Sequence, residues 1–409
     1  MGESAAVDYA PSASDGEFLS RIDAVLPMIK ARAAETETLG RASDEVTSAL
    51  IEAGMFRSLT PQQYGGLEVH PATWCEATYR VASSCASSGW FAGLVSVHNW
   101  QIAHLSKKMQ DEYFAEGPDA RASSSYAPTG KVESTEGGFN ISGRWDFSSG
   151  VDHCKWAILG AVIKDIDEPE FRSFVVPSSD FRIVPDSWQV TGLRGTGSKS
   201  VVIEGAFVPE HRTHRVVDVL AGTEPGMQHN DRPLYRIPWM SIFWYAIGAT
   251  AIGAARGGVD AFLDINRERV SPASGRPAAA NPFLWTRLAE ADHTVDLHHE
   301  RMLSNWVRMY DQVCSEPAVE RTLSRASRFD SSKAVLDCFH ALGHVYEIAG
   351  GGAIHNTNPV QRFYRDLMAM VNHPAGNLEG MAMIYSKQLL GIPPDEFDKA
   401  SMGALMEQT

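Results

Sequence analysis

The chain lacks the features that mark membrane, secreted and nucleic-acid-binding proteins. Its 409 residues contain no run of about 18 apolar residues, the length that would cross a bilayer. Residues 1–18 lack the basic and then apolar order of a signal peptide. The 36 basic residues are outnumbered by 50 acidic ones, and the net charge of −14 disfavours nucleic acid as the main partner. We therefore expect a cytoplasmic protein with no membrane or nucleic-acid partner.

Cysteine is scarce, and the common nucleotide-binding and hydrolase motifs are absent. The five cysteines form no CxxC pair, which predicts free thiols in a reducing compartment. No GxxxxGKS/T, GxGxxG or GxSxG pattern occurs, so no P-loop, Rossmann site or hydrolase elbow is predicted. His340 and His344 lie four residues apart, but no intervening glutamate or matched third ligand completes a metal site. We expect no metal.

The hydrophobic pattern changes its period twice along the chain. Apolar residues recur at helical spacing in 1–120 and again in 231–409. In 121–230 the segments are short, β-branched and aromatic, and Gly, Pro or Asp bound them, which is typical of strands. These ranges predict three domains in a mainly α fold with a central β-domain. Long apolar faces in the last of them predict a four-helix bundle, a unit often buried further by oligomerisation.

A glycine run and a lone histidine mark the C-terminal region. Gly350, Gly351 and Gly352 allow a ligand to approach the backbone closely and offer N–H groups to an anion. A neutral Asn-Thr-Asn-Pro turn and a helix start rich in Arg and Asp follow, and then His373 before a proline. Considered alone, His373 is as compatible with a helix cap as with a site residue.

This segment resembles the C-terminal part of the acyl-CoA dehydrogenase superfamily, where a similar glycine run touches a neighbouring subunit's flavin. The resemblance implies an N-terminal helical domain, a small β-barrel or sandwich and a C-terminal four-helix bundle. In the dehydrogenases a glutamate base follows the Arg-Asp pair, whereas here His373 stands roughly in its place. Arg269 follows a Gly/Ala-rich helix, and the resemblance implies a contact with the flavin's phosphate end from an adjacent subunit.

Two serine clusters and two aromatic segments complete the set of candidate residues. Trp90 and His98 follow small residues in a pattern that suits a helix packed against a planar ligand, or a plain core. Ser123–Ser125 and Ser148–Ser149 bracket a probable hairpin, where serines hydrogen-bond a ligand or merely end strands. Trp145 is a candidate to cover a ring face. The turn GLRGTGS, residues 192–198, offers flexible N–H donors to a phosphate or forms a tight turn.

Together, Trp90, His98, SSSYAP, GxWxFSSG and GLRGTGS resemble the oxygenase component of two-component, reduced-flavin-dependent aromatic hydroxylases. This family includes p-hydroxyphenylacetate hydroxylases and steroid-ring phenol hydroxylases. The resemblance implies hydroxylation of an aromatic, phenolic substrate through a flavin hydroperoxide formed from O₂ and reduced FMN or FAD. A separate NAD(P)H-flavin reductase would supply the reduced flavin, and the chain would form a homotetramer.

The resemblance also implies residue roles. His98 would bind the substrate phenol oxygen or promote its deprotonation, and His373 would assist near the reacting oxygen, with Ser149 as the third catalytic residue. The predicted flavin-binding residues are Trp90, Ser124, Ser125, Ser148, Ser149, Arg194, Thr196, Ser198, Arg269, Gly350, Gly351 and Gly352. The predicted substrate-binding residues are His98, Ser124, Tyr126 and His373. The register within each serine cluster stays open.

Other interpretations remain at this point. The chain could be an acyl-CoA dehydrogenase with Glu379 as the base, an N- or S-oxygenating relative, or a non-catalytic helical binding protein. The substrate is also open. The residues that could line a roomy aromatic pocket for a polycyclic ring, or equally form core, are Trp90, Trp100, Tyr126, Trp239, Phe243, Trp244 and Tyr245.

Overall fold

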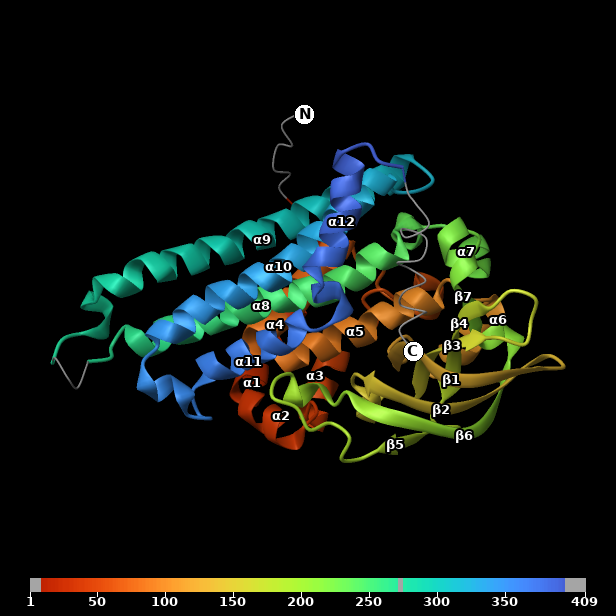
Figure 1. The fold of residues 1–409 in the computed structure, drawn as a ribbon, viewed down its shortest axis with the longest axis horizontal. Helices are drawn as coiled ribbons and strands as arrows, with labels where there is room; N and C mark the ends of the chain where they lie inside the picture. The colour runs from red at the N-terminus through yellow and green to blue at the C-terminus, as the bar shows by residue number, and fades with distance from the viewer. Residues whose placement is uncertain (1–8, 271–274, 394–409) are drawn as a thin grey trace.

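The computed structural model describes residues 9–270 and 275–393, in which helices precede a sheet and long helices follow it (Figure 1). The helices before the sheet are α1 (Ala13–Ala31), α2 (Ala33–Leu39), α3 (Asp44–Ala53), α4 (Pro71–Ser84), α5 (Ala86–Ile102) and α6 (Lys107–Tyr113). The strands are β1 (Ala122–Thr135), β2 (Gly138–Ser148), β3 (Trp156–Ile163), β4 (Glu170–Pro177), β5 (Arg182–Val184), β6 (Lys199–Pro209) and β7 (Thr213–Arg215). The helices after the sheet are α7 (Val216–Ala221), α8 (Trp239–Asn266), α9 (Pro282–Ser315), α10 (Arg321–Ile348), α11 (Pro359–Val371) and α12 (Leu378–Leu389).

The predicted fold class, mainly α with a central β-domain, is confirmed by this order of elements. In Figure 1, α8, α9 and α10 run side by side as the long members of the C-terminal bundle. The helices α11 and α12 both pack on α10. The domain boundaries at residues 120 and 230 stay predictions. Within the described residues, no helix is long and apolar enough to span a bilayer.

The sheet bends because its central strand changes partner. The strand order is β5-β6-β2-β1-β3-β4-β7, and only the β1–β3 pair among these described strands is parallel. β1 pairs with β3 from Ala122 to Ser125 and, after a register shift, again at Gly130, and it pairs with β2 from Lys131 onward. The two halves fold together, because side chains of β2, β3, β4 and β6 share one core. Trp145 fills this core and is 0 % exposed, so the expectation that it covers a ligand ring is wrong.

Helix α5 lies at the centre of the molecule and is buried on all sides. Its mean hydropathy is high and it carries no charged residue, so no face favours solvent. It packs between α4 and α8, and its Gly89 permits this close approach. A Cβ at Gly89 would lie 2.4 Å from the Cβ of Ala82 on α4, well inside contact distance. The helix is therefore a rigid support for Trp90 and His98.

The buried Trp145 in the core of the sheet leads to a prediction about stability. Trp145→Ala removes a fully buried indole whose Nε1 donates to the carbonyl of Gly160 at 2.7 Å. We expect the free energy of unfolding to fall by about 3–5 kcal/mol, since a large cavity forms. Phe207→Ala on β6 removes a side chain that is 47 % exposed and should cost below about 1 kcal/mol. Urea unfolding of both variants tests this, and equal losses would contradict the assigned core.

Candidate active site

The candidate residues come together from elements that are far apart in sequence. Trp90 and His98 lie on α5, Ser124 on β1, Ser149 just after β2, and His373 in the loop between α11 and α12. The rings of Trp90 and His373 meet edge to face, with centroids 5.4 Å apart. Trp90 therefore contacts His373 directly and shares α5 with His98.

His98 is a neutral imidazole whose tautomer is determined by the backbone. Its Nδ1 lies 2.7 Å from the carbonyl oxygen of Ala122, which can only accept, so Nδ1 carries the hydrogen. Its Nε2 is therefore an acceptor, and the hydroxyl of Ser124 donates to it at 2.9 Å. Burial lowers the pKa of His98 to about 4, so the ring is uncharged at neutral pH. His98 can accept one hydrogen bond from a ligand that displaces Ser124.

Side-chain alternation along β1 determines which serine of Ser123–Ser125 faces α5. Ser124 faces α5, whereas its neighbours point to the opposite side of the strand. Ser123 accepts from Ser148 at 2.9 Å, and Ser125 donates to the carbonyl of Asp146 at 2.6 Å. Both bonds tie β1 to β2. The predicted ligand roles of Ser125 and Ser148 therefore have no support in these contacts, and Ser124 is the member that reaches the site.

Buried hydroxyls link α5 to the GLRGTGS turn in one continuous chain. Trp90 donates from Nε1 to Ser149 at 3.0 Å, Ser149 bonds Ser198 at 2.8 Å, and Ser198 bonds Thr196 at 2.7 Å. Thr196 donates to the carbonyl of Leu193 at 2.8 Å. Since the indole can only donate and the carbonyl only accept, every hydroxyl hydrogen points toward Leu193. Ser149 keeps one lone pair free to accept from a ligand.

The same turn is held from behind by α11. Leu193 has a φ of +55°, a left-handed conformation that costs a branched residue energy, and its N–H donates to Asp366 at 2.6 Å. Gly192 permits this packing, because a Cβ there would lie 1.8 Å from the carbonyl oxygen of Arg365. The sequence marked Asp366 only as part of the Arg-Asp pair, and its bond with Leu193 was not predicted. Arg194, predicted to bind flavin, is exposed beside Glu37 and does not join the hydroxyl chain.

The ring nitrogens of His373 have the opposite hydrogen-bonding roles to those of His98. Its Nδ1 accepts from the backbone N–H of Ala375 at 3.1 Å, so Nε2 carries the hydrogen and is a donor. Removal of its ring from water lowers the pKa of His373 to about 4, so the imidazole is neutral near pH 7. The helix-cap interpretation of His373 is thus correct, and it coexists with the contact to Trp90.

An aromatic wall stands beside His98. Tyr126 meets Trp239 edge to face at 5.5 Å, and Trp239 stacks on Phe243 at 4.6 Å. Nε1 of Trp239 and Nε1 of Trp244 have no hydrogen-bond partner among the described residues, although both atoms are buried. Of the other aromatic candidates, Trp100 donates to a backbone carbonyl inside the core. In this wall, the unpaired Nε1 donor of Trp239 and the acceptor Nε2 of His98 are polar groups that can bind a planar ligand bearing oxygen atoms.

Arg269 and the glycine run lie together, but away from Trp90. Arg269 donates to the carbonyl of Ala349 at 2.8 Å, and a Cβ at Gly350 would lie 2.9 Å from its guanidinium. Figure 1 shows the end of α8 and the start of the α10–α11 connection at the far end of the bundle from the sheet. Arg256 is neutralised by aspartates such as Asp292 at 2.7 Å, whereas Arg269 pairs with no carboxylate in the part of the chain that the structure describes.

The chain is similar to known proteins in both sequence and structure. The family described as acyl-CoA dehydrogenase, C-terminal domain, matches residues 245–377. The chain is 38% identical over 377 residues to the flavin-dependent monooxygenase oxygenase subunit HsaA of Rhodococcus jostii, covering 92% of this chain and 98% of that protein. The crystal structure of the HsaA monooxygenase from M. tuberculosis superposes with a TM-score of 0.88 at 36% identity, covering 93% of this chain and 98% of that one.

The chain belongs to the oxygenase subunits of the two-component flavin-dependent monooxygenases. Another relative of this oxygenase is the oxygenase component of p-hydroxyphenylacetate 3-hydroxylase from Acinetobacter baumannii, 32% identical over 388 residues and covering 94% and 92% of the two chains. The predicted family and the monooxygenase chemistry are therefore confirmed. The dehydrogenase alternative fails, and Glu379 is exposed in the first turn of α12. The roles of single residues stay predictions.

The buried carboxyl behind the turn of this oxygenase generates a pH prediction. Burial raises the pKa of Asp366 to about 7, above its usual value of 3.8. The native state then holds a proton that the unfolded chain releases, so this group's contribution to stability falls as the pH rises from 4 to 7. Asp366→Asn keeps an acceptor for the N–H of Leu193 but does not titrate.

Between pH 5 and 7.5, we expect the free energy of unfolding to fall by about 1–3 kcal/mol more in the wild type than in Asp366→Asn. Urea unfolding at each pH measures this difference. Asp186→Asn, an exposed aspartate before the turn, is the matched control and should follow the wild-type profile. A wild-type slope in Asp366→Asn would show that Asp366 does not hold its proton.

Proposed function

We propose that this oxygenase hydroxylates a phenol with reduced FMN or FAD and O₂ as co-substrates. The observation that carries the proposal is the buried, neutral His98, whose Nε2 is an acceptor that only the small hydroxyl of Ser124 occupies. Among the relatives, p-hydroxyphenylacetate 3-hydroxylase and an FADH(2)-dependent resorcinol hydroxylase carry phenols in their names. An acceptor imidazole suits such a substrate, because a phenol donates its hydroxyl hydrogen.

The residues around Trp90 fit a flavin. The hydroxyls of Ser149, Ser198 and Thr196 are buried, neutral and contiguous, which suits the uncharged polar edge of an isoalloxazine. When bound, the reduced flavin would supply the two electrons that activate O₂, and O₂ would provide the oxygen atom that is transferred. Trp90 would cover the ring, and Ser149 would accept a hydrogen bond with its free lone pair. The α5 helix and the aromatic wall would exclude water from the reacting groups.

His98 and His373 would have different roles in hydrogen bonding and proton transfer. With its pKa lowered to about 4, His98 is too weak a base to hold the proton of a phenol, whose own pKa is near 10. It would accept a hydrogen bond, shift electron density toward the ortho carbon, and take the proton as the new bond forms. His373 would present its Nε2–H as a donor on the side of Trp90. The tautomers of both rings are ready for these tasks.

A second copy of the chain would complete each flavin site. Arg269 follows α8, and the glycine run follows α10, at the end of the bundle that lies away from the sheet in Figure 1. They offer N–H groups and a cation that pairs with no carboxylate among the described residues. Exposed apolar side chains lie on the same part of the bundle, namely Val270, Phe283, Trp285 and Ile354. This combination supports the predicted homotetramer, in which one subunit binds the phosphate of a flavin held by another. A separate NAD(P)H-flavin reductase would supply the reduced flavin in the cytoplasm.

The proposed reaction predicts isotope incorporation. Protein mixed anaerobically with reduced FMN or FAD and then with ¹⁸O₂ should transfer one ¹⁸O atom to p-hydroxyphenylacetate, resorcinol or 2-naphthol, as mass spectrometry can show. His98→Asn should lower kcat/KM for the best phenol by about 10²-fold, since a positioned acid or base contributes 10²–10⁴. His373→Ala should instead raise the fraction of reduced flavin that yields hydrogen peroxide. Transfer of no ¹⁸O to any phenol would sink the phenol assignment.

The proposed cross-subunit contact predicts a phosphate-dependent effect. Arg269→Ala should weaken binding of reduced FMN by about 10- to 100-fold, the value of a charge-assisted hydrogen bond, and leave binding of reduced riboflavin unchanged. Anaerobic titration measures both affinities. Arg267→Ala is the matched control, because Arg267 is exposed and lies near Asp264. Equal weakening for riboflavin and FMN would rule out a phosphate contact.

A further inference from the structure

One arginine of the C-terminal bundle has no carboxylate partner in the part of the chain that the structure describes. Nε of Arg328, on α10, is buried and makes no hydrogen bond among those residues. Asp330, the nearest acidic residue in the sequence, instead binds Arg301 at 2.7 Å and Asn305 at 2.7 Å. Burial lowers the pKa of Arg328 to about 10, and the positive charge of Arg325 acts in the same direction, so the guanidinium is still charged at neutral pH. A buried charge of this kind costs stability unless an anion joins it.

A second unpaired donor lies at the same place. The guanidinium carbon of Arg328 is 5.9 Å from the centroid of the Trp244 ring, on α8. Trp244 is 8 % exposed, and its Nε1 is buried without a hydrogen-bond partner among the described residues. Adjacent buried donors that both lack an acceptor are unusual, since most buried N–H groups are paired. The two donors therefore indicate an acceptor from outside the described residues, and the positive charge favours an anion.

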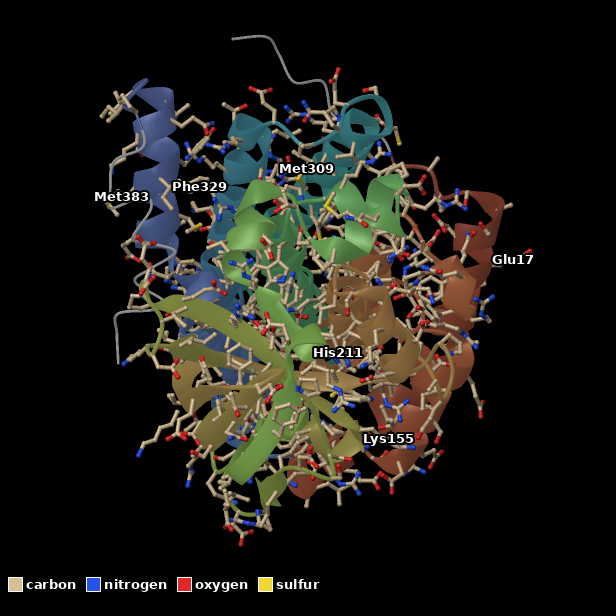
Figure 2. The ribbon with its side chains drawn as sticks, turned by 90° about the vertical axis from the view of Figure 1, so that its right-hand side faces the viewer. Glu17, Lys155, His211, Met309, Phe329 and Met383 are labelled. Carbon is tan, nitrogen blue, oxygen red and sulfur yellow. The ribbon has the colours of Figure 1, made fainter. Side chains whose placement is uncertain are left out.

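Arg328 lies on the side of α10 that meets the loop between α11 and α12. Ser332 follows Arg328 by one helical turn and is 0 % exposed. Its hydroxyl donates at 2.7 Å to the carbonyl of Ala375, in the loop that also holds His373. Figure 2 labels Phe329, the next residue of α10, near α12, on which its ring stacks. The unpaired guanidinium is therefore on the same side of the bundle as the His373 loop.

The second donor is next to the aromatic wall of the candidate site. Trp244 directly follows Phe243 on α8, and the ring centroid of Phe243 lies 5.9 Å from that of His98. Ser331 of α10 donates to the carbonyl of Trp244 at 3.0 Å, which holds α10 against α8 at this level. Two consecutive residues of α8 thus connect the imidazole of His98 on one side with the unpaired donors on the other.

We propose that Arg328 and Trp244 bind a carboxylate group of the substrate, an inference that rests on the proposed phenol hydroxylation. The carboxylate accepts a hydrogen bond from each unpaired donor, and its charge neutralises the guanidinium. The substrate class then narrows to phenols that carry a carboxylate away from the hydroxyl. The net charge of −14 repels anions from the molecule as a whole, so a preference for such a substrate has to come from a local cation.

Binding of hydroxyphenyl carboxylates and of their methyl esters tests this assignment. 4-Hydroxybenzoate, 4-hydroxyphenylacetate and 3-(4-hydroxyphenyl)propanoate place the carboxylate at increasing distances from the hydroxyl. Calorimetric titration of the protein, loaded anaerobically with reduced FMN or FAD, measures each affinity. In the wild type, at least one carboxylate should bind about 10- to 100-fold more tightly than its ester, the worth of a charge-assisted hydrogen bond.

Variants at both donors assign this preference. Arg328→Met keeps an apolar stem and removes the charge, so the carboxylate should bind no better than its ester. Arg328→Lys keeps the charge without the planar fork and should retain part of the preference. Trp244→Phe keeps an aromatic ring but lacks Nε1–H, and it should weaken binding of the carboxylate by about tenfold. Arg321→Met, at the exposed start of α10, is the matched control and should keep the full preference.

The outcomes separate this inference from the function on which it rests. Equal affinities for every carboxylate and its ester in the wild type, or a preference that survives in Arg328→Met, overturn the carboxylate site while the phenol site stands. A wild-type protein that binds none of these phenols and transfers no oxygen overturns both.

Thermal unfolding identifies any variant that fails to fold. Arg328→Met should unfold at or above the wild-type temperature, because it removes a buried charge that has no partner. If that variant does not fold, a full wild-type preference in both Arg328→Lys and Trp244→Phe overturns the inference instead.

Discussion

Alternation of side chains along β1 is the constraint on which the site depends. One face of the strand sends Ser124 toward α5, and the other sends Ser123 and Ser125 into bonds with the neighbouring strand. A slip of one residue would exchange these faces and leave His98 without its partner. The β1–β2 bonds of the serine clusters therefore also hold the register that places the hydroxyl of Ser124 against α5.

Hydrogen bonds with backbone atoms, rather than with charged side chains, determine the tautomers of both His98 and His373. The carbonyl of Ala122 requires a hydrogen on Nδ1 of His98, and the N–H of Ala375 requires a bare Nδ1 on His373. The two rings thus have opposite hydrogen-bonding roles, and neither bonds an ionised group among the described residues. Folding itself sets the tautomers, so that only Ser124 must move before Nε2 of His98 can accept from a ligand.

Much of the fold was predictable from period and composition, since helices, strands and helices differ in both. Motif resemblance predicted Trp90, Ser149 and His373 as members of one site, and Trp90 contacts both of the others. The Arg-Asp pair marked Asp366 in the sequence, but its bond with Leu193 was not predictable, because the two residues lie far apart in the sequence. The choice of Ser124 within its cluster also required the structure, since strand register depends on partners that a motif does not reveal.

The one-way hydroxyl chain has a thermodynamic consequence. Ser149 gives its hydrogen to Ser198 and can only accept from a ligand. In the flavin site that we propose here, Ser149 would face a bare N5 on oxidised flavin and an N5–H donor on reduced flavin. A pocket that prefers the reduced form must, by linkage, raise the midpoint potential of the flavin it holds. Under that proposal, oxidised flavin would leave more readily than reduced flavin.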